Sequence, residues 1–105
     1  MSNNIKFGFV AVHPGEVLKD EIEYRKIPHS QLVRRLKISG KNLTDILSCR
    51  RHVTVETAML FEAALNIPAD TLMRLQLKYD MQTAHNDKKF LTRLADVRKI
   101  ASMFK

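Results

Sequence analysis

The sequence contains few of the residues that mark disulfide-bonded, metal-binding or loop-rich proteins. Its 105 residues include one cysteine, three glycines, three prolines and no tryptophan. A lone cysteine, Cys49, excludes an internal disulfide and suits a reducing cytoplasm. The four histidines lie far apart without a cysteine at ligand spacing, which argues against a zinc site. We expect neither a metal nor a cofactor.

Long apolar segments and targeting signals are absent as well. No stretch approaches the ~18 apolar residues of a membrane span. Residues 1–12 lack the basic start, the long apolar run and the cleavage site of a signal peptide. Hydrophobic residues form 45% of the chain, which is enough for one core, and this length favours a single domain. We therefore expect a cytoplasmic protein without membrane contact.

Positive charge is concentrated in two segments of a chain whose net charge is +7. Residues 29–53 contain six Lys or Arg against one acid, and residues 87–105 contain six against two. Such segments either keep a surface soluble or attract a polyanion, and charge alone does not separate the two. The scattered carboxylates form no acid–base pair, and no Gly-rich phosphate loop is present, so we expect no enzymatic activity.

Helical periodicity dominates the sequence. Ser39, Thr54 and either Asn86 or Asp87 are candidate N-caps, because their side chains accept hydrogen bonds from the first turn of a helix. Residues 6–12 alternate in polarity and predict a short extended arm. The pattern predicts an all-α protein of five to six helices, at about 14–26, 29–37, 39–48, 54–65, 68–83 and 88–104.

The segment SGKNLTDILSCRR, residues 39–51, carries the strongest functional signal. Its apolar residues Leu43, Ile46 and Leu47 form one narrow ridge, and a helix this short is stable only when that ridge packs on a core. Two or three residues separate it from the preceding helix, so the two helices cross steeply, as in a helix-turn-helix. With the ridge turned inward, the outward residues are Gly40, Lys41, Asn42, Thr44, Asp45 and Ser48.

These outward side chains match the chemistry of a DNA major groove. Lys41 can donate to guanine O6 and N7, Asn42 can pair with adenine, and Asp45 can accept from cytosine N4. The helix N-terminus behind Ser39 favours a phosphate, and Gly40 leaves room for its approach. The alternative is an ordinary amphipathic surface helix with charged flanks. The candidate DNA-binding residues are Arg34, Arg35, Ser39, Gly40, Lys41, Asn42, Thr44, Asp45, Arg50 and Arg51.

Four segments of the chain, in order, resemble one protein family. They are HPGEVL (13–18), LVRRLKISGKNLTDIL (32–47), RRHVTVETAMLFEAAL (50–65) and LQLKYD (75–80). Together they are similar to the HigA-type antitoxins, a branch of the Xre-type helix-turn-helix regulators, over about residues 13–83. The resemblance implies a lambda-repressor-like DNA-binding fold with an added C-terminal helix.

The resemblance also implies a function. It implies a homodimer that binds a palindromic operator, represses its own toxin–antitoxin operon and neutralises a small RelE-like, mRNA-cleaving toxin by direct binding. Such a protein is cytoplasmic and nucleoid-associated when bound to DNA. By analogy, residues 39–48 are the recognition helix, supported by residues 29–37. The expected organisation is an N-terminal extended arm at 1–12, a DNA-binding domain at 13–83 and a C-terminal helix at 84–105.

Three sites depart from the family pattern. Cys49 stands where the family usually turns on a glycine, and a left-handed backbone there costs a non-glycine residue about 1 kcal/mol. Thr71 and Leu72 replace a Phe–Trp pair, and Pro28 replaces a capping serine. Cys49 itself is either a small residue tolerated in a turn or a redox-sensitive thiol whose thiolate the following arginines favour.

The predicted fifth helix is apolar on two sides, which indicates burial on two sides. One stripe is formed by Leu72, Leu75 and Tyr79. The second stripe, and the outer face of the fourth helix, need a partner. Three partners are possible: the last helix, a second subunit or the toxin. The last helix could pack on its own domain or on that of a dimer mate. The candidate interface residues are Leu60, Ala63, Met73, Leu77 and Met81.

Two other functions fit the sequence. One is a stand-alone Xre-type transcriptional regulator, which a neighbouring RelE-like reading frame would argue against. The other is a protein-interaction module whose basic face binds an acidic protein or RNA. Residues 29–53 contain no aromatic residue on which bases could stack, which disfavours RNA. His13 has no nucleophile or paired acid at a defined spacing, so we expect it to cap or pack a helix.

Overall fold

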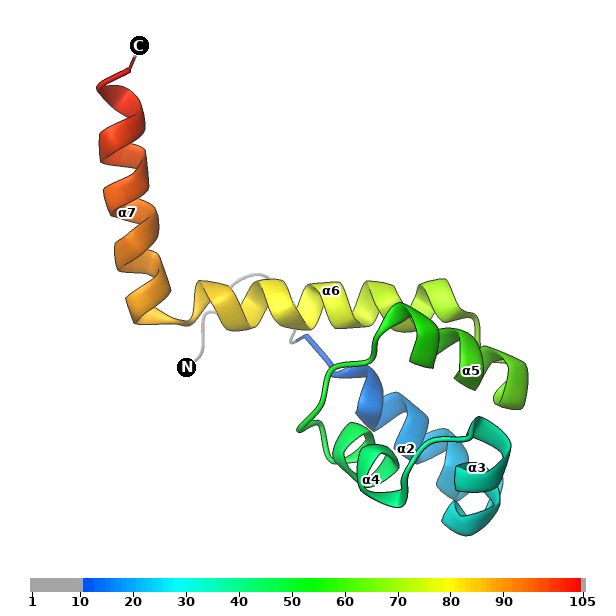
Figure 1. The fold of residues 1–105 in the computed structure, drawn as a ribbon. Coiled ribbons are helices and arrows are strands. Elements are labelled where there is room, and N and C mark those ends of the chain that lie inside the picture. Colours follow the sequence, from blue (N-terminus) through cyan, green and yellow to red (C-terminus); the bar gives the residue numbers. More distant parts are fainter. Residues whose placement is uncertain (1–10, 105) are drawn as a thin grey trace.

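The computed structural model describes residues 11–104, which fold into helices and loops without a β-strand (Figure 1). The predicted all-α class is confirmed for this part of the chain, and the helix bounds differ from the predicted ones by one or two residues. The predicted arm falls almost wholly on residues 1–10, outside the described residues. The helices are α2 (Pro14–Tyr24), α3 (His29–Leu36), α4 (Gly40–Leu47), α5 (Val55–Leu65), α6 (Ala69–His85) and α7 (Lys88–Ser102).

Capping side chains explain where most of these helices begin. The Ser39 hydroxyl accepts a hydrogen bond from a backbone N–H of α4 at 3.0 Å, and the Thr54 hydroxyl does the same for α5 at 3.2 Å. His13 caps α2 and Asp87 caps α7 in the same way. α3 begins after Pro28 without a side-chain cap, as the sequence at that site suggested.

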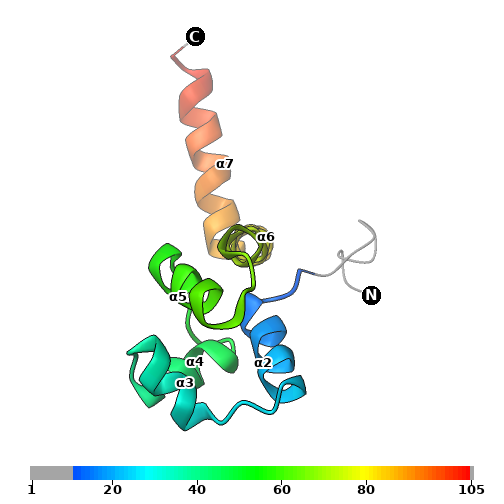
Figure 2. The ribbon, with the colours of Figure 1, turned by 90° about the vertical axis from the view of Figure 1, so that its right-hand side faces the viewer.

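Helices α2 to α5 enclose one apolar core, and α6 lies across it (Figures 1 and 2). The apolar ridge of α4 is buried against α2 and α3, so the predicted inward face of α4 is confirmed. Phe61 of α5 and Leu72 of α6 are fully buried and tie these two helices to the same core. The core residues are Leu18, Ile22, Leu32, Leu36, Leu43, Ile46, Leu47, Val53, Ala58, Phe61, Leu65 and Leu72.

A glycine fixes how closely α2 approaches α4. A Cβ atom added at Gly15 would collide with the backbone carbonyl oxygen of Ile46. Because backbone cannot yield as a flexible side chain does, only glycine permits this approach. The first turn of α2 therefore holds the last turn of α4 in place.

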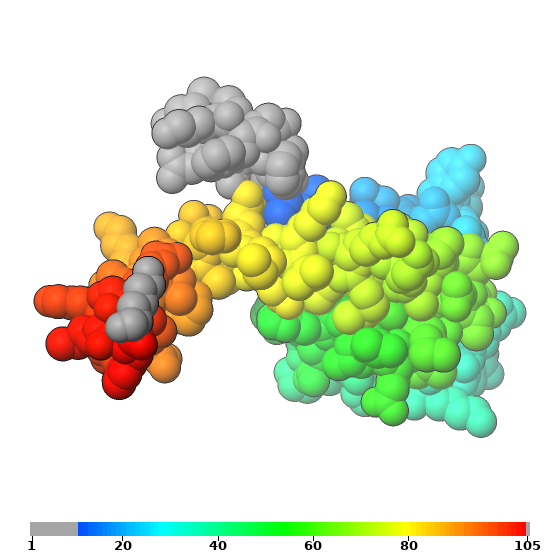
Figure 3. All heavy atoms as spheres, turned by 90° about the horizontal axis from the view of Figure 1, so that it is seen from above, coloured from blue at the N-terminus to red at the C-terminus, as the bar shows by residue number. Residues whose placement is uncertain are grey.

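The last helix, α7, stands away from this body. Among the helices it contacts only α6, and it has no buried residue (Figures 1 and 3). The radius of gyration, 17.5 Å, exceeds the ~13 Å expected for a compact chain of this length. One arrangement expected for the C-terminal helix was packing on its own domain. In this chain α7 does not cover its own domain. None of the helices between residues 11 and 104 has both the length and the apolar character needed to cross a bilayer.

Candidate nucleic-acid interface

Helices α3 and α4 form the expected helix-turn-helix. α3 ends at Leu36 and is capped by Lys37, whose backbone is left-handed with φ 56° and whose N–H donates to the Val33 carbonyl at 3.0 Å. The chain then passes through Ile38, which packs partly against the core, to the cap at Ser39. A reversal this short is typical of a helix-turn-helix, in which the two helices cross steeply.

Four of the six residues of α4 and its cap that the sequence placed outward are exposed, Asn42 is half-buried and Asp45 is buried. Gly40, Lys41, Thr44 and Ser48 are exposed, and the side chain of Lys41 is 81% accessible. A Cβ atom added at Gly40 would meet no other atom within 4 Å. The packing of this chain therefore does not explain the glycine at the open N-terminus of α4.

Asp45 was predicted to point outward and is instead buried at 8% accessibility. Its Oδ2 lies 3.3 Å from Nζ of Lys41 and 3.4 Å from Nη2 of Arg51, and its Oδ1 lies 3.3 Å from Nη2 of Arg50. Burial alone would raise the pKa of Asp45, but Lys41, then Arg50 and Arg51, outweigh it and lower that pKa. The expectation that Asp45 presents a free acceptor was wrong, because three cations already occupy its carboxylate.

Asn42 is half-buried and is only partly placed for base pairing. Its backbone N–H donates to the Ser39 cap, while its side-chain Oδ1 is buried without a hydrogen-bond partner among the described residues. Bidentate pairing with adenine needs both the oxygen and the nitrogen of the amide. The Asn42 side chain must therefore rotate before it can make that pair.

The turn after α4 brings two of the predicted arginines to Asp45. The backbone N–H groups of Arg50 and Arg51 donate to the Asp45 carbonyl at 2.8 and 3.1 Å. Cys49 lies at φ 67°, so the turn is left-handed at a non-glycine residue, as considered from the sequence. Arg34 and Arg35 are exposed on α3 and are not among the cations that contact Asp45.

The thiol of Cys49 is not activated by the arginines that follow it. Burial, and then the carboxylate of Glu16, raise the pKa of Cys49. A raised pKa means less thiolate, which is the reactive form. The interpretation of Cys49 as a small residue tolerated in the turn fits this environment better than a redox sensor.

Gln76 of α6 was not selected from the sequence, yet it anchors the segment that follows the basic turn. It is buried at 3% accessibility, accepts from the Val53 N–H at 2.8 Å and donates to Asp80 at 2.9 Å. Asp80 in turn lies 3.8 Å from Nε2 of His52. The sequence contained a sign of this role. Gln76 lies at helical spacing between Leu72 and Tyr79, so it is a polar residue on the inward face of the helix.

His13 caps α2, as expected. Its Nδ1 accepts from the Gly15 N–H at 2.8 Å, and its ring packs edge-on against Tyr79 of α6 at a centroid distance of 4.9 Å. Burial, and then the neighbouring His52, lower the pKa of His13, although Asp80, Glu16 and the backbone of Arg51 act in the opposite direction. The neutral ring is the form that can accept this hydrogen bond.

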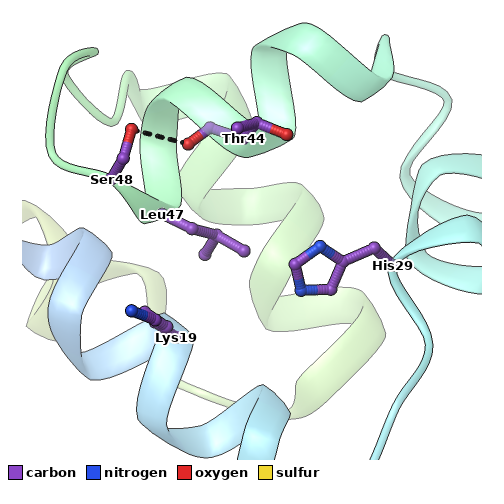
Figure 4. A pocket seen from close by; sticks show the side chains of 5 residues that line it. All are labelled: Lys19, His29, Thr44, Leu47 and Ser48. Atoms are coloured by element: carbon purple, nitrogen blue, oxygen red, sulfur yellow. Dashed lines mark hydrogen bonds between the residues drawn. The ribbon is translucent and has the colours of Figure 1, made fainter.

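An open hollow lies where α2, α3 and α4 meet (Figure 4). Leu47 forms its apolar floor, Lys19 and His29 stand on its sides, and the Ser48 hydroxyl donates across its rim to the Thr44 carbonyl at 2.8 Å. These side chains provide no nucleophile with a paired base. Within residues 11–104 no group of three or more His, Cys, Asp or Glu side chains could hold a metal ion.

The predicted interface residues divide into two kinds. Met73 packs partly against the core, while Leu60 is 40%, Leu77 62% and Met81 53% accessible. Ala63 is exposed beside Leu60 on α5. The outer face of α5 and α6 is therefore apolar and uncovered by α7 of the same chain.

Comparison with known proteins places this arrangement in a family. No family model matches the chain. The virulence-associated protein I of Dichelobacter nodosus is 28% identical over 79 residues, which are 74% of this chain and 73% of that protein. An addiction module antidote protein of the HigA family from Coxiella burnetii is 29% identical with a TM-score of 0.69, covering 82% of this chain and 92% of that chain.

A further solved structure is that of the antitoxin HigA of Pseudomonas aeruginosa, determined with the higBA promoter. It is 31% identical to this chain with a TM-score of 0.68, and the match covers 73% of this chain and 85% of that chain. Identity at this level over most of the relative's length, with the helix-turn-helix and its capped α4 in place, shows the family. The chain belongs to the HigA-type antitoxins, a branch of the Xre-type helix-turn-helix family.

Proposed function

We propose that this protein binds double-stranded DNA at the promoter of its own operon, represses that operon and neutralises a small RelE-like toxin by direct binding. One observation carries the DNA-binding part. α4 is fixed by its buried ridge, while its capped N-terminus and the polar edge with Lys41 and Thr44 are exposed beside a basic turn. A helix held in this way is suited to enter a major groove.

The flanking charges support the same arrangement. Arg34, Arg35, Arg50 and Arg51 are exposed on both sides of α4 in the sequence, where they can contact phosphates. Lys41 is a highly accessible donor on α4 itself, at 81%, and is our first candidate for a base contact. The related antitoxin from Pseudomonas aeruginosa was solved with promoter DNA, which supports DNA as the partner here.

We further propose that the chain acts as a homodimer through the apolar outer face of α5, α6 and α7. Large apolar patches are rarely left exposed on monomeric proteins, and Leu77, Met81 and Val97 are each more than half accessible. A two-fold dimer would place two copies of α4 about 34 Å apart, to read a palindromic operator. Such a protein would work in the cytoplasm, on the nucleoid.

The proposed dimer is tested by placing positive charges on the apolar face of α6. Leu77→Lys combined with Met81→Lys should yield a monomer in sedimentation velocity and should weaken operator binding. Tyr24→Lys is the matched control, since Tyr24 is 84% accessible on α2, and it should leave both unchanged. If the double variant sediments like the wild-type protein, the interface lies elsewhere.

The toxin partner is tested by co-expression with the neighbouring gene. Co-purification of a small basic protein of RelE-like fold, and rescue of growth by the antitoxin, are the expected results. If no such gene lies beside this one, the protein is a stand-alone Xre-type regulator.

DNA binding is tested with purified protein on the duplex just upstream of its gene and on a scrambled duplex, at two salt concentrations. We expect selective binding that weakens with salt. Four phosphate contacts by the arginines would give a log–log slope of about −3.6. Equal, weak binding to both duplexes would contradict the proposal and would leave a basic surface for an acidic protein partner.

A further inference from the structure

Asp45 is the single acidic residue between residues 29 and 53, in the most basic part of the chain. Its carboxylate is buried, and its partners come from both sides of the turn that ends α4. Lys41 lies one helical turn earlier, and Arg50 and Arg51 lie after the turn, all within 3.4 Å of a carboxylate oxygen. One negative charge thus holds three positive ones.

Asp45 also holds the backbone of the same turn. Its carbonyl oxygen accepts from the N–H groups of Arg50 and Arg51, and from the Ser48 hydroxyl at 3.3 Å. The two arginines are therefore attached to Asp45 at both ends, by main chain and by guanidinium. This double attachment fixes the path of the turn and the direction of both side chains.

The three cations remain open to a ligand on their other side. The side chains of Lys41, Arg50 and Arg51 are 81%, 66% and 48% accessible, whereas that of Asp45 is 12% accessible. An Arg guanidinium has five N–H donors, so contact with Asp45 leaves donors for a phosphate or a base edge. Without the carboxylate, three like charges this close together would repel each other and spread apart.

We propose that Asp45 is a positioning residue for operator recognition, which holds Lys41, Arg50 and Arg51 in their DNA-bound directions before DNA arrives. This inference rests on the proposed DNA binding. Side chains that are already ordered lose less conformational entropy on binding, and this favours the one sequence that fits them. The negative charge also weakens attraction to DNA of any sequence.

The first test replaces the carboxylate by an isosteric amide. Asp45→Asn should lower the ratio of operator affinity to scrambled-duplex affinity by about tenfold, while its binding to the scrambled duplex becomes tighter and more salt-dependent. Asp70→Asn is the matched control, because Asp70 forms an exposed pair with Arg74 at 3.4 Å, away from α4. It should keep the wild-type ratio. An unchanged ratio in Asp45→Asn overturns the proposal.

A second test separates positioning from a direct base contact. In an Arg50→Gln, Arg51→Gln background, Asp45→Asn should have a smaller further effect on the operator preference, because Lys41 alone remains of the three side chains through which it acts. A direct contact to cytosine predicts the opposite result, which is a full loss in that background confined to one base pair. That result overturns the proposal.

A third test uses the wild-type protein without DNA. It can therefore be carried out even if the Asp45→Asn variant does not fold. Nitrogen-15 relaxation of the arginine side chains should show Arg50 and Arg51 ordered and Arg34 and Arg35 mobile. Equal mobility of the four overturns the proposal. If the wild-type protein does not prefer the operator over the scrambled duplex, the proposed DNA-binding function is refuted. Failure of the Asp45 proposal and failure of the proposed function are therefore distinguishable.

Discussion

Helices α4 and α7 look alike in sequence and differ in the fold. Both have apolar residues at helical spacing, a capping side chain at the start and basic residues beside them. The eight residues of α4 include four buried ones, whereas the fifteen residues of α7 include none. Periodicity thus identifies the apolar face of a helix, but it does not identify what covers that face.

The difference arises from the neighbours of each helix. α4 is enclosed by α2 and α3, and Gly15 allows α2 to approach the last turn of α4 closely. Two residues, Asn86 and Asp87, separate α6 from α7. Among the helices, α7 contacts α6 alone. The α4 region is complete within one chain, whereas no residue of α7 is buried within that chain.

The largest expected effect separates the two regions by stability. Phe61→Ala should lower the free energy of unfolding by about 3–5 kcal/mol, because it opens a cavity in the core. Phe104→Ala, at a residue 83% accessible on the C-terminal side of α7, should change it by less than about 0.5 kcal/mol at concentrations where the protein is monomeric. Urea unfolding followed by circular dichroism measures both. Equal losses would show that α7 is packed in the monomer.

The next effect compares two glycines. Gly15 of α2 faces the last turn of α4, and Gly40 is the first residue of α4. Gly15→Ala should destabilise the fold by about 1–3 kcal/mol, because its Cβ collides with the Ile46 carbonyl. Gly40→Ala should leave stability unchanged or raise it by up to ~1 kcal/mol, because its Cβ meets no atom. Thermal unfolding measures both changes.

The same pair sharpens the functional contrast. If a DNA backbone approaches the N-terminus of α4, Gly40→Ala should weaken operator binding while the protein stays folded. A Gly40→Ala protein with full operator affinity would show that the DNA does not approach there. A stable Gly15→Ala protein would show that α2 can move away from α4 without cost.

The smallest expected effect is a dependence of stability on pH. Burial and His52 lower the pKa of His13 in the folded protein below its ordinary value of 6.5. The unfolded chain therefore takes up a proton that the folded chain resists, and stability falls as the pH drops below about 6.5. Unfolding at pH 7.5 and 5.5 measures this loss.

His13→Asn is the informative variant for this effect. Asparagine keeps an oxygen that can cap α2 but does not titrate, so the loss of stability between the two pH values should shrink. His85→Asn, at an exposed residue of α6, should retain the full loss. If both variants behave like the wild-type protein, another group causes the pH dependence.

Most of the secondary structure could be predicted because its signals are local. Ser39, Thr54 and Asp87 cap the helices that the sequence assigned to them. The inward residues of α4 were also correct, since a short helix has one narrow apolar ridge to bury. The position of α7 away from its own domain could not be predicted, because a local pattern does not specify what an apolar face packs against.

The errors at the candidate site have a common physical cause. Asp45 was placed outward because polar residues usually face solvent, yet a carboxylate can be buried when cations surround it. Two of its three cations are on the far side of a turn whose path depends on the left-handed backbone at Cys49. Gln76 was missed for a similar reason, since its partner Val53 is 23 residues away in sequence.

We propose that the exposed edge of α4 reads bases, and the Lys41→Ala variant separates base reading from phosphate contact. Binding is measured on the operator and on duplexes in which each base pair is changed in turn. Loss of a direct contact should cost about 1–3 kcal/mol on the operator and relax specificity at one base pair. An equal loss on every sequence would contradict the claim, because Lys41 would then contact only phosphate.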